Sequence, residues 1–379
     1  MLKLGIIGYG VRTAYVWQGT MKPIGGVELC AIADPKWEQI KEKSGHELPN
    51  CNFYATAEEM LENEKLDGVM IGTRDDLHTK YALLVAKYDI PLFLEKPVAI
   101  DDEQLSQLET IKEQMDEKTV VSFPLRMSTI VVKIKEMIDS GLIGKLSQVQ
   151  AYNNVYYARC YYHGWYRNDK VTGGLYMTKT THALNYIDFI LGSKGPKWLT
   201  SMESKVIFKG DNPAGLKCAD CDKKDCLENP INLSESDRKL YDSENAYCSF
   251  AVDTGNHDSA TIMMMYEDGM HVVYTQNFVA RHGAGKRGAR FIGFKGTIEF
   301  DFNTATITYI DHFSDKVENI TVTEGGAHSG GDYLLAKNFI DVMAGKEKSI
   351  ASLSEGILSA KMCLCARKSA QNKSIVEVQ

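Results

Sequence analysis

Three polar side chains near the middle of the chain have the types and spacing needed to handle a proton. Lys179, His182 and Tyr186 stand at positions i, i+3 and i+7 of the segment that follows Gly173-Gly174. On one α-helix this spacing puts all three on the same face. A lysine, an imidazole and a phenol that converge there could hold a hydroxyl group and take its proton. The alternative is a helix whose histidine and tyrosine are packed in a core and whose lysine is solvated.

The elements that must position such a group begin with an apolar run, residues 2–7, which predicts a buried parallel strand. It ends at Gly8-Tyr9-Gly10, where Gly8 allows a tight turn and Gly10 has no Cβ to keep a pyrophosphate away. The helix expected next offers free N–H groups and the positive end of its dipole. Thr13 stands where this dinucleotide-binding motif usually has its third glycine or alanine, so the motif is incomplete.

A second predicted strand, residues 27–33, ends at Asp34. A carboxylate there can accept both ribose hydroxyls of an adenosine and repels a 2′-phosphate, which favours NAD over NADP, although Lys36 argues the other way. Further strands are expected at 66–72, 90–94 and 119–122, and helices at 36–45, 57–64, 77–88 and 102–116. Strands that alternate with helices in this way predict a doubly wound parallel sheet.

In order and spacing, Gly8-x-Gly10, Asp34, residues 73–78 and Glu95-Lys96-Pro97 resemble the Gfo/Idh/MocA oxidoreductases, named after glucose–fructose oxidoreductase and inositol dehydrogenase. The resemblance implies that Lys96 lies beside the nicotinamide and the substrate hydroxyl, and that a cis peptide bond precedes Pro97. It also implies that the 173–188 segment is the active-site helix. The residues predicted to bind NAD are Gly8, Tyr9, Gly10, Val11, Arg12, Asp34, Thr73, Arg74, His78, Glu95 and Lys96.

The sequence departs from the family's pattern at one position that matters for the chemistry. Many of these dehydrogenases carry an aspartate four residues before the active-site histidine, and Thr178 stands there in this chain. A threonine hydroxyl cannot act as a base near neutral pH. Burial and the nearby Lys96 would lower the pKa of Lys179 and let it serve instead. We therefore predict Lys96, Lys179 and His182 as the catalytic residues.

Aromatic and hydrogen-bonding groups, which suit the apolar faces and hydroxyl edges of a sugar, gather just ahead of this helix. Arg126 is a candidate for binding an anionic group such as a carboxylate or sulfonate, with a structural salt bridge as the alternative. The resemblance implies that the loop at residues 328–332 returns near the active site. The predicted substrate contacts are Arg126, His163, Trp165, Tyr166, Arg167, Tyr186 and His328.

The pattern changes after Ser122, which predicts an α/β Rossmann domain at 1–122 and an α+β domain at 123–379. Alternating runs there predict a large, mostly antiparallel open sheet with one covered face; they lie at 147–156, 259–266, 271–279, 289–294, 297–302 and 305–310. The resemblance implies that this sheet pairs with another subunit, so a homodimer or homotetramer is expected. The last helix, at 352–369, is expected to pack back on the Rossmann domain.

Cysteines cluster in a polar insertion at about 208–250, with Cys218-x2-Cys221-x4-Cys226 followed by Cys248. Four thiolates at this spacing could close a tetrahedral zinc site that holds the insertion together. The alternative is a set of reduced thiols in a mobile loop. An iron–sulfur cluster is less favoured than either.

The composition excludes several classes of partner. With a net charge of −7 and a pI of about 5.8, the chain lacks the basic character of proteins that bind nucleic acid or anionic membranes. No segment approaches the roughly 20 apolar residues of a membrane span, and the N-terminal residues do not have the pattern of a signal peptide. A cytoplasmic location is therefore expected, with mostly reduced cysteines.

Together these features predict an NAD-dependent oxidoreductase that acts on a hydroxyl of a sugar, glycoside or cyclic polyol. The alternative is a redox-neutral, NAD-dependent glycoside hydrolase that oxidises, eliminates, hydrates and reduces its substrate and retains its NAD. A third hypothesis, which rests on Thr178, is a non-catalytic sensor that binds NAD or a sugar nucleotide.

Overall fold

The computed structural model describes residues 1–323 and 330–378, which form two compact units. Unit 1 comprises residues 1–132, 181–193 and the described part of 324–364; unit 2 comprises 133–180, 194–323 and 365–378. The expected boundary after Ser122 was a single one, whereas the chain passes from one unit to the other five times.

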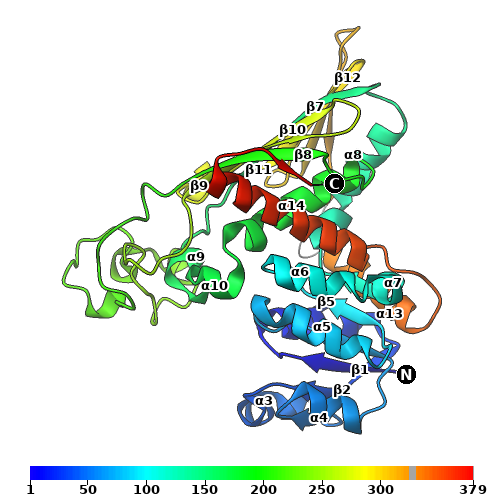
Figure 1. Ribbon diagram of the computed structural model, residues 1–379, viewed down its shortest axis with the longest axis vertical. Coiled ribbons are helices and arrows are strands. Elements are labelled where there is room, and N and C mark those ends of the chain that lie inside the picture. The colour runs from blue at the N-terminus through cyan, green and yellow to red at the C-terminus, as the bar shows by residue number, and fades with distance from the viewer. Residues whose placement is uncertain (324–329, 379) are drawn as a thin grey trace. The chain divides into compact units, whose positions relative to one another are not determined.

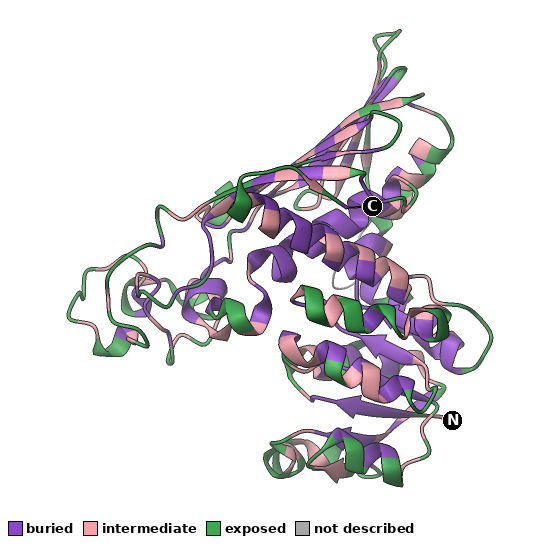
Figure 2. Ribbon diagram, viewed as in Figure 1, coloured by how far each residue is buried: buried purple, intermediate pink, exposed green. Residues whose placement is uncertain are grey.

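Unit 1 is built on a six-stranded parallel sheet with the strand order β3-β2-β1-β4-β5-β6. Strands β4, β5 and β6 are wholly buried, β1 and β2 mostly so (Figure 2), because apolar side chains are needed on both faces of a covered sheet, whereas the edge strand β3 has no buried residue. The strand order reverses between β1 and β4, which is where ligands bind in open α/β sheets. The strands are β1 (Leu2–Ile7), β2 (Val27–Ala33), β3 (Asn52–Tyr54), β4 (Gly68–Ile71), β5 (Leu92–Leu94) and β6 (Thr119–Val121).

The helices of this unit come from distant parts of the chain (Figure 1). Phe339 of α13 meets Phe93 of β5 edge to face, with ring centroids 5.5 Å apart, so the late helix belongs to the core of the early sheet. The helices are α1 (Val11–Val16), a π-helix (Trp17–Met21), α2 (Lys22–Ile24), α3 (Trp37–Ser44), α4 (Ala57–Asn63), α5 (His78–Ala86), α6 (Asp102–Glu109), α7 (Lys112–Met115), α11 (Thr181–Ile190) and α13 (Gly331–Met343).

Two long helices continue from one unit into the other. They are α8 (Thr129–Asp139) and α14 (Leu353–Asn372), and α14 leaves unit 1 after Leu364. None of the described helices is long and apolar enough to cross a membrane.

Unit 2 is built on a nine-stranded sheet with the order β14-β13-β12-β11-β7-β10-β9-β8-β15. Neighbouring strands are antiparallel except β7 and β10, which are parallel. This arrangement confirms the predicted fold class. The strands are β7 (Leu146–Asn154), β8 (Trp198–Ser204), β9 (Ser259–Met265), β10 (His271–Asn277), β11 (Lys286–Gly293), β12 (Gly296–Asp301), β13 (Thr306–Asp311), β14 (Val317–Thr321) and β15 (Val376–Glu377).

Apart from the parts of α8 and α14 that reach into unit 2, the α- and π-helices described outside this sheet are short. They are α9 (Cys160–His163), α10 (Asp169–Thr172), a π-helix (Tyr176–Thr180) and α12 (Glu235–Arg238). The insertion at 208–250 therefore keeps little regular structure, in line with its weak hydrophobic pattern.

Candidate active site

The two glycines of the turn after β1 have different structural roles. Gly8 has a φ of +82°, and a Cβ there would come within 2.8–2.9 Å of Thr73. The fold itself thus requires glycine at position 8. Gly10 has an ordinary φ of −82°, and a Cβ there would meet no atom within 4 Å. The open space beside Gly10 fits the close approach of a pyrophosphate.

Thr13 occupies the place of the missing third glycine and stabilises the same turn. Its side chain is buried, and Oγ1 lies 2.8 Å from the carbonyl oxygen of Gly8 and 3.1 Å from that of Gly10. Gly72, at the end of β4, makes room for it, because a Cβ on Gly72 would lie 2.1 Å from Cγ2 of Thr13. Close packing of α1 against the end of β4 therefore depends on the glycine at position 72 and not on a small residue at position 13.

Asp34 is held at the end of β2, beside the glycine turn. One carboxylate oxygen accepts a hydrogen bond from the backbone N–H of Tyr9 at 3.0 Å, and the other accepts one from the N–H of Lys36 at 2.8 Å. Each oxygen keeps a lone pair for a further donor. The side chain is thus oriented to accept hydrogen bonds from ribose hydroxyls.

Arg12 binds three neighbouring side chains of unit 1. Its Nε donates to Glu95 at 2.9 Å, and one terminal nitrogen donates to Ser122 at 3.1 Å and to Asp332 at 2.5 Å. Burial opposes the charge, but Glu95 and Asp332 outweigh it and raise the pKa of Arg12. Arg12, predicted as a cofactor contact, therefore ties the glycine turn to the ends of β5 and β6 and to α13.

Lys96 follows Glu95 directly and is half-buried, and the Lys96–Pro97 bond is cis, as the resemblance implied. His78, another predicted cofactor contact, is buried behind it. Its Nδ1 lies 2.7 Å from the carbonyl oxygen of Pro97 and its Nε2 lies 3.3 Å from that of Thr73. Both partners are backbone carbonyl oxygens, so the ring is held between two acceptors. His78 thereby links the turn that carries Lys96 to the loop after β4.

Asp75, which the sequence analysis did not single out, lies close to this group. It begins the 3₁₀ turn Asp75–Leu77, it is 7% exposed, and its Oδ2 makes no hydrogen bond within the described chain. Burial raises its pKa to about 6, against the opposing charges of His78 and Lys96. A carboxyl group with this pKa changes charge near neutral pH, which is typical of functional sites. Its place in the loop after a buried strand was the signal available in the sequence.

His182 belongs to α11 and also lies in unit 1. It is half-buried between two buried neighbours, and its ring meets Phe123 edge to face, with centroids 6.3 Å apart. Phe123 follows Ser122, whose hydroxyl donates to Glu95 at 2.8 Å. A short series of contacts therefore connects the helix of His182 with the strand end that carries Lys96.

The segment before His182 is not the regular α-helix that was predicted. Residues 176–180 form a π-helix, and α11 begins at Thr181. A π-helix has a wider turn than an α-helix, so the α-helical spacing used for Lys179 does not hold there, whereas His182 and Tyr186 both stand on α11. Tyr186 is fully buried, whereas His182 is partly exposed.

Lys179 and Thr178 make contacts within unit 2. The Thr178 hydroxyl donates to the carbonyl oxygen of Gly174 at 3.1 Å. Lys179 is buried, and its Nζ donates a hydrogen bond to the hydroxyl oxygen of Tyr157. The predicted catalytic residue Lys179 is therefore held by Tyr157.

Comparison with known proteins supports the reading of this geometry. The family model described as "Oxidoreductase family, NAD-binding Rossmann fold" matches residues 2–123, and the GFO/IDH/MocA C-terminal domain matches residues 131–299. The chain belongs to the Gfo/Idh/MocA oxidoreductases. This confirms the resemblance inferred from the motifs and identifies unit 1 as an NAD-binding Rossmann domain.

Individual relatives of this Gfo/Idh/MocA protein are distant. YteT of Bacillus subtilis is 25% identical over 372 residues, which cover 86% of each chain. Myo-inositol 2-dehydrogenase of Thermotoga maritima is 24% identical over 202 residues, which cover 51% of this chain and 56% of that protein. The solved structure of levoglucosan dehydrogenase with NADH and levoglucosan has a TM-score of 0.78 at 16% identity and covers 100% of this chain and 99% of the other.

Several predicted substrate contacts of this Gfo/Idh/MocA protein are engaged in structural interactions. Arg126 is buried, lies 2.6 Å from a carboxylate oxygen of Glu355 and packs on the ring of Phe189 at 4.4 Å. Arg126 is therefore already neutralised within unit 1, which leaves no support for its binding an anionic substrate. His328 lies outside the described residues.

The predicted contacts at 163–167 fold into the insertion of unit 2. His163 is buried between the carbonyl oxygen of Tyr247, at 2.7 Å, and the carboxylate of Glu228, at 3.3 Å. Arg167 is buried and pairs with the carboxylate of Asp253, just after the insertion, at 2.8 Å. Trp165 and Tyr166 stack on each other at 4.0 Å and stay half-buried. These two aromatic rings remain the accessible members of the group.

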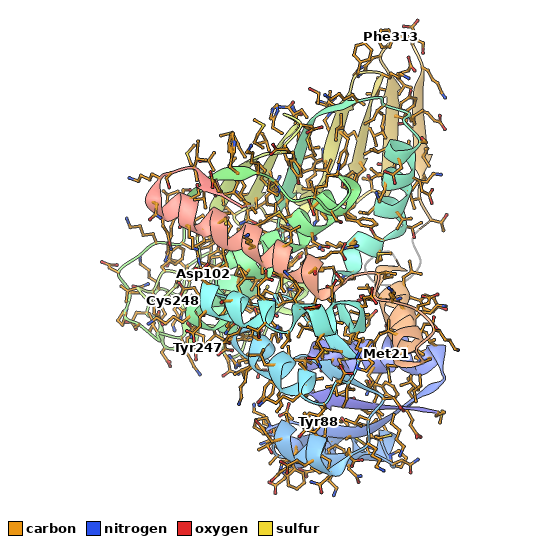
Figure 3. All side chains as sticks on the ribbon, turned by 45° about the vertical axis from the view of Figure 1, so that its right-hand side comes forward. Met21, Tyr88, Asp102, Tyr247, Cys248 and Phe313 are labelled. Carbon is orange, nitrogen blue, oxygen red and sulfur yellow. The ribbon has the colours of Figure 1, made fainter. Side chains whose placement is uncertain are left out.

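The four cysteines predicted to bind zinc line one pocket of unit 2 as free thiols (Figure 3 labels Cys248). Burial and the three neighbouring thiols raise the pKa of Cys218 to about 12. Within residues 1–323 and 330–378, no group of three or more His, Cys, Asp or Glu side chains is arranged to hold a metal ion. The structure therefore does not support the zinc prediction.

Proposed function

We propose that this oxidoreductase uses NAD to oxidise a secondary hydroxyl of a sugar, glycoside or cyclic polyol. The observation that carries the proposal is the half-buried Lys96, which is held at the carboxyl end of β5 by the Arg12–Glu95 contact on one side and by His78 on the other. The names of its relatives, inositol dehydrogenase and levoglucosan dehydrogenase, support a polyhydroxylated ring as the substrate.

The residues of unit 1 fit NAD. The turn at Gly8–Gly10 and the first N–H groups of α1 would hold the pyrophosphate, and Asp34 would accept hydrogen bonds from the adenosine ribose. The negative charge of Asp34 would repel a 2′-phosphate, so NAD is favoured over NADP. When bound, the nicotinamide accepts the hydride.

The side chains of the protein would manage the charge and the proton of the reacting hydroxyl. The Lys96 ammonium would donate a hydrogen bond to the hydroxyl oxygen and stabilise the negative charge that develops as the proton leaves. His182 would orient the same hydroxyl, since its imidazole can donate or accept. The proton then needs a base, and His182, which lies in unit 1 with Lys96, is the candidate.

The test is turnover by the intact protein with a matched pair of lysine variants. The protein is incubated with NAD and a panel of sugars, cyclic polyols and aryl glycosides, and NADH absorbance and aglycone release are followed together. Lys96→Met should lower kcat/KM by about 10²–10⁴-fold, the usual range for a group that acts on the reacting proton. Lys87→Met, at an exposed lysine after α5, should behave as wild type. Equal activity of the two variants would refute the role of Lys96.

A redox-neutral glycoside hydrolase is the second candidate, and Thr178 in place of a carboxylate is the observation that favours it. In that case the purified protein should release stoichiometric NAD on denaturation, and aglycone should appear without net NADH. An empty coenzyme site together with NADH that accumulates on added sugar and NAD would establish the dehydrogenase instead.

A further inference from the structure

The loop after β4 lies between the glycine turn and the turn that carries Lys96, and all three belong to unit 1. On one side, a Cβ on Gly8 would come within 2.9 Å of the backbone of Thr73. On the other side, Nδ1 of His78 lies 2.7 Å from the carbonyl oxygen of Pro97. A charged group enclosed by this loop therefore lies at the edge of the sheet where Lys96 stands.

The loop encloses the carboxyl group of Asp75, which is only 7% exposed and whose Oδ2 makes no hydrogen bond within the described residues. Other contacts hold the loop in place. Gln104 donates to the carbonyl oxygen of Asp76 at 2.9 Å. At the start of α5, the hydroxyl of Thr79 donates to the carbonyl oxygen of Val98 at 2.8 Å. A buried carboxylate without a hydrogen-bond donor costs stability, so Asp75 is not there to stabilise the loop.

Four neighbouring groups act electrostatically on this carboxyl group. His78 and Lys96 favour its charged form, whereas Glu95 and Asp76 oppose it. The charge of Glu95 is already paired, because it accepts a hydrogen bond from Arg12 at 2.9 Å. Asp76 is half-buried and thus partly solvated. The enclosed carboxyl group has a pKa of about 6, so above neutral pH it supplies a negative charge that acts on Lys96.

We propose that Asp75 is a positioning residue that attracts the Lys96 ammonium and keeps it charged at the carboxyl edge of the parallel sheet. The inference rests on the proposed function. A charged Lys96 can stabilise the negative charge that develops on the reacting oxygen, which a neutral amine cannot do as well. Because little water reaches Asp75, its attraction for a cation is stronger than that of an exposed carboxylate. Asp75 thus acts through Lys96 and makes no bond to the substrate.

The first measurement needs no substrate. Full-length wild type, Asp75→Asn and the control Asp102→Asn, at an exposed carboxylate of α6, are treated briefly with acetic anhydride at about pH 8, where an acid with a pKa of about 6 is ionised. Mass spectrometry of the peptides gives the rate of acetylation of Lys96 relative to that of Lys87, an exposed lysine.

In Asp75→Asn, Lys96 should be acetylated about two- to tenfold faster than in wild type, because loss of the negative charge favours the neutral amine, which is the form that reacts. Asp102→Asn should match wild type. Equal rates at Lys96 in wild type and Asp75→Asn would overturn the proposal.

The second measurement uses the substrate found in the panel. Asp75→Asn should lower kcat/KM by about 10–10²-fold with unchanged NAD affinity, and Asp102→Asn should stay near wild type. In a Lys96→Met background, Asp75→Asn should cost no further activity, because its effect passes through Lys96. Wild-type turnover by Asp75→Asn, or a further loss in the double variant, would overturn the proposal.

Urea unfolding separates this role from a structural one. Asp75→Asn should lose activity while it gains stability above pH 6, because it no longer buries a charge. A loss of stability that accompanies the loss of activity would make the role structural and would contradict the proposal. If wild type itself turns over nothing in the panel, the proposed function fails, while the acetylation rates still decide whether Asp75 acts on Lys96.

Discussion

At the scale of single residues, the buried carboxyl group of Asp75 predicts how the stability of the protein changes with pH. Burial raises the pKa of its carboxyl group to about 6 in the folded protein, from 3.8. Between these two values the folded state binds more protons than the unfolded state, so this group lowers stability as the pH rises through that window. Asp75→Asn cannot ionise and should be more stable than wild type above pH 6, by about 1–3 kcal/mol.

Urea unfolding of the two proteins at several pH values checks this expectation. The difference in unfolding free energy should shrink toward zero as the pH falls to 3.8. Asp222→Asn, at an exposed carboxylate, is the control and should show no such trend. A constant difference across the window would mean that Asp75 is not the titrating group.

Substitution by alanine should affect mainly the stability of the fold at Gly8 and mainly NAD binding at Gly10. Gly8→Ala should destabilise the fold by about 1–3 kcal/mol, because alanine is strained at a φ of +82° and its Cβ meets Thr73. Gly10→Ala should change stability by about 0.5 kcal/mol, since its Cβ meets no atom within 4 Å, but it should weaken NAD binding. Thermal unfolding and NAD titration calorimetry separate the two effects. Unchanged NAD affinity in Gly10→Ala would remove position 10 from the coenzyme site.

At the scale of elements, the Arg12 contacts hold four segments of unit 1 together. Arg12→Met leaves Glu95 and Asp332 buried without their cation and should cost about 2 kcal/mol of stability. It should also lower kcat, because Glu95 adjoins Lys96. Adding Asp332→Asn removes one of the unpaired charges, so the double variant should unfold at a higher denaturant concentration than Arg12→Met alone. Simple additivity of the two losses would contradict this account.

The elements also show why some features could be predicted and others could not. Some features depend on local signals, namely the apolar runs, the glycine turn and the Glu95-Lys96-Pro97 tripeptide. These patterns predicted the parallel sheet, its ligand-binding edge and the family. The π-helix at 176–180 has no such signal, because its bonding pattern depends on how the segment is packed. The Tyr157–Lys179 pair, separated by 22 residues, was hidden for the same reason.

Other features that the sequence analysis did not predict were hidden for similar reasons. Strand β8 has the apolar Met202 on its open face and the polar Ser201 on its buried face, and the short β14 is almost wholly exposed, so neither shows the alternation that marks a half-buried strand. Arg126 and Arg167 were sensible candidates by residue type. Their carboxylate partners, Glu355 and Asp253, lie far along the chain and could not be inferred from spacing.

At the scale of the whole molecule, the open face of the nine-stranded sheet makes a prediction about association. Met202 of β8 and Met263 of β9 are 72% and 44% exposed and lie on the same face as Val273 of β10. An apolar face of this kind is typical of subunit interfaces. We expect a homo-oligomer in light scattering, and Met202→Glu/Met263→Glu should shift it toward the monomer. Phe313→Glu, at an equally exposed phenylalanine outside the strands, is the control and should leave the mass unchanged.

The repeated passage of the chain between its two units constrains how a gene of this kind can be divided. Unit 1 is completed only by residues 181–193 and by the described part of 324–364. A truncated product ending after residue 132 would lack α11 and α13, so Phe93 would lose its contact with Phe339 and expose the face of the sheet that α13 covers. A recombination point after residue 132 would therefore join the parallel sheet of one parent to the α11 and α13 of another, and the contact of Phe93 with Phe339 would have to be matched between them.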